Sequence, residues 1–162
     1  VKKFITIIDA VGKKKGALLV QFPPSVSMKQ WKQLSALINC LRDNDPDHVW
    51  SIALEFRHPS LYNSVVYDLL EAKEMGIVIH DKAPAMTPIR DNHLPFIYMR
   101  FHGPEGNYRG SYDEMVLAEY ASYIREWLME EKTVYTYFNN TMGNAIGNLD
   151  LLRDRVVLQN GN

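Results

Sequence analysis

Residues 50–59 read WSIALEFRHP, an apolar run of strand length that ends in charged side chains and a proline. Apolar residues at consecutive positions are typical of a strand that is covered on both faces. Glu55, Arg57 and His58 stand at the end of the run, and Pro59 is typical of the first turn of a helix. The stretch therefore predicts a buried strand that leads directly into a helix.

The same arrangement recurs on both sides of this stretch. Further strands are expected at residues 17–22, 76–81, 96–102 and 133–140. Ser27 with Gln30, and Ser111 with Glu114, have the spacing of helix capping boxes, and each precedes a stripe of apolar residues at helical spacing. Buried strands that alternate with helices indicate a parallel sheet joined by right-handed crossovers. We predict an α/β fold, which both a doubly wound sheet and a (β/α)₈ barrel satisfy.

Composition narrows the class of protein further. A hydrophobic share of 46% and a charged share of 23% over 162 residues are typical of one domain with a real core, so we expect a single domain over residues 1–162. Eighteen basic against nineteen acidic residues leave a net charge of −1. Without a basic excess, we expect neither nucleic-acid nor membrane partners.

Two further features of the sequence bear on the cellular compartment of the protein. No apolar stretch approaches the roughly 20 residues that a membrane-spanning helix needs. The single cysteine, Cys40, has no internal partner for a disulfide, and we expect it to be a small buried side chain. A cytoplasmic location follows as the expectation.

Polar side chains stand at the carboxyl end of every expected strand. They are Gln21, Glu55 with Arg57, His80 with Asp81, Arg100 with His102, and Asn139 with Asn140. In parallel α/β folds this edge of the sheet carries the chemistry, so we expect these groups at one end of a single sheet. The alternative is that each of them is a satisfied ion pair or hydrogen bond within a barrel layer.

The two arginines predict the class of ligand. A guanidinium is a permanently charged, planar donor that suits phosphate or carboxylate, so Arg57 and Arg100 predict a small anionic ligand. The loop HGPEGNYRG at residues 102–110 follows one strand, and its glycines fit either a phosphate site or plain turns. We therefore expect the substrate-binding residues to be Gln21, Arg57, Arg100, Tyr108, Asn139 and Asn140, with Tyr108 or Tyr112 covering the ligand.

Glu55 and His102 are the candidate proton-transfer pair, because histidine titrates near neutrality and a carboxylate near a cation stays ionised. Their alternative role is ion pairing with Arg57 and Arg100. Glu55, His80, Asp81 and His102 also offer ligands for a divalent metal, but the arginines would repel it. We assign no metal ligand, and the sequence predicts no particular cofactor.

Four strings carry a resemblance to a known family: GALLVQFPPS (16–25), ALEFRHPS (53–60), YMRFHGPEGNYRGSY (98–112) and VYTYFNNTMGNA (134–145). In order and spacing the chain resembles the YecE-like family, also called domain of unknown function 72. The resemblance implies a TIM-type barrel with shared motif positions, and it implies no activity. It covers the chain from Gly16 to Leu152.

The chain departs from that family in lacking its glycine- and tryptophan-rich first strand, its EINSTFY-like second strand and a third strand with a lysine. It resembles the C-terminal five strands of a barrel that needs about 250 residues. We expect either upstream sequence or another chain to complete it. A five-stranded remnant would leave two strand edges open, which predicts a homodimer with apolar contacts near Leu19, Val20, Tyr135 and Tyr137.

The function expected from these features is an enzyme that acts on a small anionic substrate by general acid–base catalysis at the carboxyl ends of the strands. One alternative is a binding module that holds the same anion without turnover. The other is a metal-dependent hydrolase or nuclease-like barrel, with metal at Glu55, His80 and His102.

Overall fold

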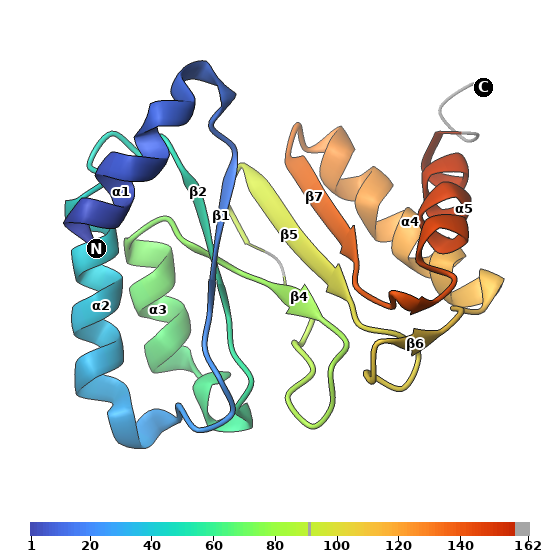
Figure 1. Ribbon diagram of the computed structural model, residues 1–162, viewed down its shortest axis with the longest axis horizontal. Coiled ribbons are helices and arrows are strands. Elements are labelled where there is room, and N and C mark those ends of the chain that lie inside the picture. Colours follow the sequence, from blue (N-terminus) through green and yellow to red (C-terminus); the bar gives the residue numbers. More distant parts are fainter. Residues whose placement is uncertain (91, 158–162) are drawn as a thin grey trace. The chain divides into compact units, whose positions relative to one another are not determined.

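The computed structural model describes residues 1–90 and 92–157 (Figure 1). The chain forms two compact units, Val1–Ile77 and Val78–Asn162. Both units combine parallel strands with helices, which confirms the predicted α/β class.

The first unit contains a three-stranded parallel sheet in the order β1-β2-β3. Its elements are α1 (Lys2–Ile8), η1 (Asp9–Lys14), β1 (Ala17–Gln21), η2 (Met28–Gln30), α2 (Trp31–Asp43), β2 (Ser51–Glu55), η3 (Pro59–Leu61), α3 (Ser64–Ala72) and β3 (Gly76–Ile77), where η marks a 3₁₀ helix. The register pairs Gln21 with Glu55, so the polar ends of β1 and β2 are adjacent.

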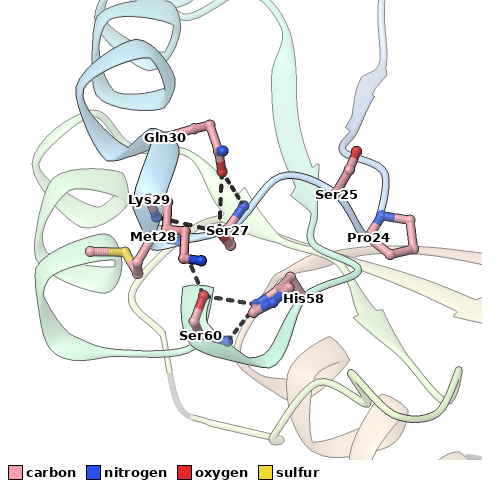
Figure 2. A pocket seen from close by; sticks show the side chains of 8 residues that line it. All are labelled: Pro24, Ser25, Ser27, Met28, Lys29, Gln30, His58 and Ser60. Atoms are coloured by element: carbon pink, nitrogen blue, oxygen red, sulfur yellow. Dashed lines mark hydrogen bonds between the residues drawn. The ribbon is translucent and has the colours of Figure 1, made fainter.

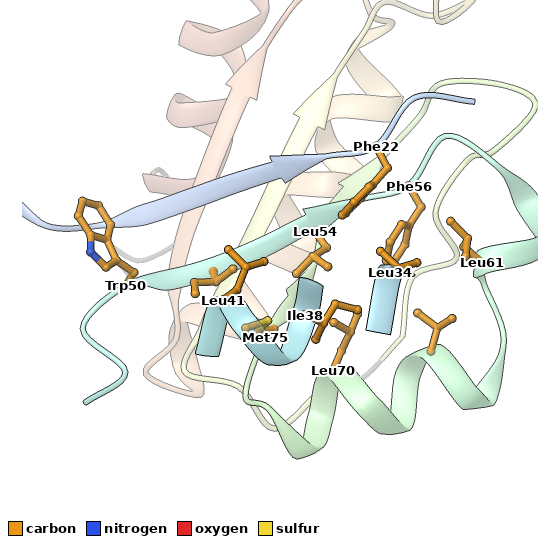
Figure 3. Close-up of a cluster of buried hydrophobic side chains, with 12 residues drawn as sticks. Phe22, Leu34, Ile38, Leu41, Trp50, Leu54, Phe56, Leu61, Leu70 and Met75 are labelled. Atoms are coloured by element: carbon orange, nitrogen blue, oxygen red, sulfur yellow. The ribbon is translucent and has the colours of Figure 1, made fainter. Parts of the chain in front are cut away.

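The core of the first unit lies between this sheet and helices α2 and α3 (Figure 3). Ser27 forms the predicted capping box with Gln30. The stripe that follows buries Leu34, Ile38 and Leu41 against alternate residues of β2, among them Leu54. Period-two alternation then places Glu55 on the opposite face of the sheet.

The second unit contains a parallel sheet in the order β4-β5-β7 and a two-stranded parallel pair, β6-β8. Its elements are β4 (Ile79–His80), β5 (Phe96–Phe101), β6 (Arg109–Gly110), α4 (Glu114–Met129), β7 (Thr133–Phe138), β8 (Met142–Gly143) and α5 (Ala145–Val157). Helices α4 and α5 pack beside β7, as Figure 1 shows.

Alternation along β5 separates an apolar face from a polar one. Ile97, Met99 and Phe101 pack in a cluster with residues of α4 and with Leu152 of α5. Tyr98, Arg100 and the following His102 occupy the alternate positions and so share the other face. The face that the helices leave uncovered therefore carries the candidate chemistry.

Three expectations need correction. The expected strand at residues 76–81 divides into β3 and β4, which belong to different sheets, so the described strands form no single sheet. Helix α4 is capped by Asp113, which accepts from the backbone N–H of Met115, instead of by Ser111. Cys40 is exposed, because it lies on α2 outside the buried stripe.

Two observations bear on the barrel and on the membrane. The strands at residues 1–90 and 92–157 form no closed barrel, because each three-stranded sheet has two end strands. In the same residues, no helix has the length and apolar character that crossing a bilayer requires.

Candidate functional site

The candidate residues fall into two groups, one in each unit. Gln21, Glu55 and Arg57 lie at the carboxyl ends of β1 and β2 in the first unit. Arg100, His102, Tyr108, Asn139 and Asn140 lie at or beyond the carboxyl ends of β5 and β7 in the second.

In the first unit, Glu55 and Arg57 form an ion pair between Oε1 and Nη2. The carboxylate side chain is 0% exposed and the guanidinium side chain 6% exposed. Two residues apart on an extended chain, they share a face, which is why sequence spacing alone could predict their contact. The pairing is one of the two roles expected for Glu55, and its part in proton transfer stays a prediction.

In the second unit, His102 is bound to Asp81. Oδ1 of Asp81 accepts the backbone N–H of His102 at 2.8 Å and lies 3.2 Å from its ring Nδ1. A carboxylate only accepts hydrogen bonds, so Nδ1 carries the ring proton and donates it. In the neutral ring, Nε2 then holds the lone pair that can accept a proton.

Tyr112 fixes Asp81 from the other side. Its phenol donates to Oδ2 of Asp81 and accepts the backbone N–H of Gly103 at 2.6 Å. Burial alone would raise the pKa of Asp81, but the hydrogen bonds from His102 and Tyr112 outweigh it and hold that pKa below its usual range. Burial and the neighbouring Asp81 carboxylate raise the pKa of Tyr112, so the phenol keeps its proton.

Arg100 lies beside the His102–Asp81 pair, on the face of β5 that His102 shares. Its Nε donates to Oδ1 of Asn139 at 3.3 Å, across the β5–β7 register. Tyr98 and Tyr137 stack with ring centroids 5.0 Å apart on that face. Asn139 thus orients a guanidinium two residues from His102.

Tyr108 lies next to the ring of His102, with centroids 5.4 Å apart and the rings nearly perpendicular. Its φ of 68° is in the left-handed region, which non-glycine residues rarely adopt. Lys82 holds it there: the ammonium is 4.3 Å from the Tyr108 ring centroid and donates to the carbonyl of Gly106 at 2.6 Å. The position agrees with the expected cover for a ligand, a role that stays a prediction.

Asn140 differs from the other candidates because its amide is used inside the unit. Fully buried, it donates from Nδ2 to the carbonyl of Gly110 at 2.9 Å and to Oδ1 of Asn148 at 3.0 Å. Asn148 in turn accepts the backbone N–H of Tyr112. These bonds tie the loop that carries Tyr112 to helix α5.

The first unit has a cavity of about 490 Å³ beside η2 and η3 (Figure 2). His58 Nδ1 accepts from the backbone N–H and the hydroxyl of Ser60, and that hydroxyl accepts the backbone N–H of Met28 at 3.0 Å. Ser27 accepts from Lys29 in its own capping box. The polar groups of the cavity wall thus join two loops to each other.

In the part of the chain that the structure describes, no group of three or more histidine, cysteine, aspartate or glutamate side chains could hold a metal ion.

Sequence reasoning missed the pairing of His102 with Asp81 and the role of Tyr112. It placed Asp81 at a strand end, as a metal ligand or as a satisfied ion pair or hydrogen bond without a named partner, and it read Tyr112 as a loop residue over the site. Tyr112 is instead buried beneath the loop. The signal available in the sequence was the HD pair at the end of an apolar run next to a strand that ends in RFH.

Comparison with known proteins gives the family. The model described as "Protein of unknown function DUF72" matches residues 1–162. Among curated proteins, none matches the chain.

Two solved structures share the fold. A DUF72 family protein from Thermotoga maritima is 24% identical, with a TM-score of 0.77 over 98% of this chain and 65% of its own. A DUF72 family protein from Enterococcus faecalis is 21% identical, with a TM-score of 0.79 over 96% of this chain and 66% of its own. The chain thus spans slightly less than two thirds of their length, and the family match over all its residues shows that it belongs to the DUF72 family.

Proposed function

We propose that the chain carries a proton-transfer site for a small anionic substrate, with His102 as general base and Arg100 as the anion-binding group. The observation that carries this proposal is the contact between His102 and Asp81, together with the hydrogen bond that Tyr112 donates to Asp81. A histidine whose Nδ1 donates to a carboxylate is held in one tautomer and one orientation, which is what a general base requires.

The electrostatics favour the same role. Because its pKa is held below the usual range, Asp81 is ionised at neutral pH and stabilises the imidazolium that forms when His102 takes a proton. The raised pKa of Tyr112 keeps the phenol a donor to Asp81 rather than a competing base.

Arg100 supports the choice of an anionic substrate. It lies on β5 two residues before His102, which follows the strand, and two residues of extended chain span roughly 6.6 Å. A substrate bound through phosphate or carboxylate would then place its reacting atoms several ångströms from the anion, near the imidazole. Tyr108 stands beside the imidazole and would exclude water from the bound substrate.

Several finer expectations belong to the same proposal. From the strand-end pattern of the sequence, Gln21 and Arg57 are expected to bind substrate and Glu55 to take part in proton transfer. The two sheets are parts of a TIM-type barrel, and the protein works in the cytoplasm. Each of these stays a prediction.

A panel of phosphorylated and carboxylated metabolites tests the proposal, with binding followed by thermal shift and turnover followed by NMR. We expect Arg100→Gln to weaken binding of the anion. Loss of a charge-assisted hydrogen bond costs about 1.5–3 kcal/mol, or roughly 10- to 150-fold in affinity. We expect His102→Gln to keep binding and to lose about 10²–10⁴-fold in turnover.

Matched controls come from the same unit. Arg153→Gln removes an exposed arginine of α5, and His93→Gln removes an exposed histidine of the loop before β5; both should behave as the native chain. A ligand that Arg100→Gln releases but that no condition converts to product would favour the binding module over the enzyme.

A further inference from the structure

We propose that the cavity beside η2 and η3 is a further binding site, for a small organic molecule that carries a phosphate group (Figure 2). The side chains of Lys29 and His58 bind the phosphate, and Pro24 and Met28 contact the rest of the molecule. The site lies within the first unit, and it uses none of the residues assigned to the proposed function.

The cavity lies where parallel α/β folds place their ligand sites. Strand β1 ends at Gln21 and β2 at Glu55, and these two residues are register partners. The loops that follow, residues 22–27 and 56–58, therefore begin side by side, and both contribute to the cavity wall. Ligands of parallel sheets bind outside the carboxyl ends of the strands. A volume of about 490 Å³ is also within the usual range for small-molecule sites.

The backbone N–H groups at the start of the two 3₁₀ helices are already occupied. That of Met28 donates to the hydroxyl of Ser60 at 3.0 Å, and that of Lys29 donates to the hydroxyl of Ser27 at 3.3 Å. The N–H of Ser60 donates to Nδ1 of His58 at 3.2 Å. A ligand in the cavity is therefore held by side chains and not by the helix ends.

His58 presents a hydrogen-bond donor whose position is fixed. A backbone N–H can only donate, so Nδ1 of His58, which accepts from Ser60, carries a lone pair. The proton of the neutral ring is then on Nε2. In the part of the chain that the structure describes, this nitrogen has no hydrogen-bond partner, and the partly exposed ring lines the cavity. Nε2 is therefore able to donate to a ligand.

The other uncommitted groups of the wall are donors too. The ammonium group of the exposed Lys29 contacts no acceptor within residues 1–90 and 92–157. Oε1 of Gln30 accepts the N–H and the hydroxyl of Ser27 at 2.9 and 3.1 Å, which leaves the amide NH₂ group to donate. Among the described residues that line the cavity, none is an aspartate or a glutamate. Such a wall is complementary to anionic oxygens.

The number of donors favours a phosphate over a carboxylate. Lys29, Gln30 and His58 offer three donor groups from two segments of the chain. A phosphate monoester has three terminal oxygens that accept hydrogen bonds, so each donor group can have an oxygen of its own. Pro24 and Met28 add apolar surface to the wall, which suits an organic group attached to the phosphate.

Titration of the full chain with phenyl phosphate, followed by ¹H–¹⁵N NMR, tests the proposal without any variant. We expect saturable shifts of the backbone N–H signals of Met28, Lys29 and Ser60, together with the ring nitrogens of His58. Benzoate is the matched carboxylate and should bind more weakly. If millimolar phenyl phosphate leaves these signals unchanged, or if benzoate binds more tightly, the proposal is wrong.

Two variants locate the phosphate group. Lys29→Gln should weaken binding of phenyl phosphate about two- to fivefold, because ion pairs of exposed lysines contribute little. His58→Asn keeps a side-chain acceptor for the N–H of Ser60 but removes Nε2, and we expect a loss of about tenfold. Lys32→Gln changes the net charge equally at an exposed position outside the cavity and is the matched control. Equal weakening by both lysine variants would indicate general attraction to a basic surface and overturn the site.

Arg100→Gln separates this site from that of the proposed function. Binding that Lys29→Gln and His58→Asn weaken, but Arg100→Gln does not, supports the cavity. Binding that only Arg100→Gln weakens overturns the cavity site and supports the proposed function. The shifts measured on the native chain decide the matter even if His58→Asn does not fold.

Discussion

Tyr112 donates its phenolic proton to Oδ2 of Asp81, a residue 31 positions earlier in the chain. The same oxygen of Tyr112 accepts the backbone N–H of Gly103, so one phenol joins the loop after β4 to the loop after β5. Both loops carry residues of the candidate site, and the geometry of that site depends on this contact.

Tyr112→Phe should therefore destabilise the protein. It removes a hydrogen bond to a charged group and leaves the N–H of buried Gly103 without its acceptor, a loss of about 1–3 kcal/mol. Urea unfolding measures the change. Tyr120→Phe is the matched control, because the half-buried Tyr120 phenol makes no hydrogen bond within the described residues, and an equal loss there would contradict the assignment.

The lowered pKa of Asp81 predicts a pH dependence of stability. Because the folded-state pKa lies below the unfolded value of about 3.9, Asp81 contributes stability that is fully present above that value and lost as the pH falls through the folded pKa. Asp81→Asn removes this contribution. The difference in unfolding free energy between the native chain and Asp81→Asn should shrink as the pH falls below 4. A difference that does not change with pH would refute the linkage.

Substituting only one partner of the Glu55–Arg57 ion pair should strongly destabilise the folded protein. With both side chains buried, Arg57→Met removes a cation that contacts the carboxylate, and a loss of about 3–5 kcal/mol is expected. The double variant Glu55→Gln with Arg57→Met should recover part of that loss, because no unmatched charge is left by the pair. A double-mutant cycle by chemical unfolding checks this, and strict additivity of the two single changes would disprove the coupling.

Gly143 permits the close approach of β8 to β6. A Cβ at this position would lie 2.1 Å from the carbonyl oxygen of Gly110, and that contact is with backbone, which cannot move aside as a side chain could. Gly143→Ala should cost about 3 kcal/mol through overpacking. Gly12→Ala is the comparison, since nothing lies within 4 Å of its Cβ and only its φ of 61° is unfavourable. Thermal unfolding that ranks Gly12→Ala as the more damaging change would contradict this account.

The strands at the ends of the sheets predict that the chain associates with a second copy of itself. Strands β1 and β7 each end their sheet, and Tyr137 of β7 is 44% exposed. We expect the 162-residue chain to dimerise through such an edge or through the adjoining sheet face, and Tyr137→Lys to weaken the dimer. Light scattering on protein of verified mass measures this. Met115→Lys on helix α4, where the methionine is 81% exposed, serves as the control, and a stable native monomer would disprove the prediction.

Local sequence determined the elements of this protein. Helix α2 follows from the Ser27–Gln30 capping box and the stripe at Leu34, Ile38 and Leu41, because both depend on residues three or four positions apart. The polar residues at the strand ends could also be predicted from the sequence. A buried apolar run that is followed by charged residues indicates the carboxyl edge of a parallel sheet. The Glu55–Arg57 pair belongs with them, because an extended chain places residues two apart on one face.

Tertiary structure alone decided which of those polar groups meet. Asp81 becomes the partner of His102 because β4 and β5 pair in the register of His80 with Arg100, and register depends on contacts between segments that are distant in sequence. Tyr112 reaches Asp81 because Asn148 of α5 holds the loop before α4. The tautomer of His102 depends on its long-range contact with Asp81, so the sequence could propose histidine chemistry but not say which ring nitrogen carries the proton.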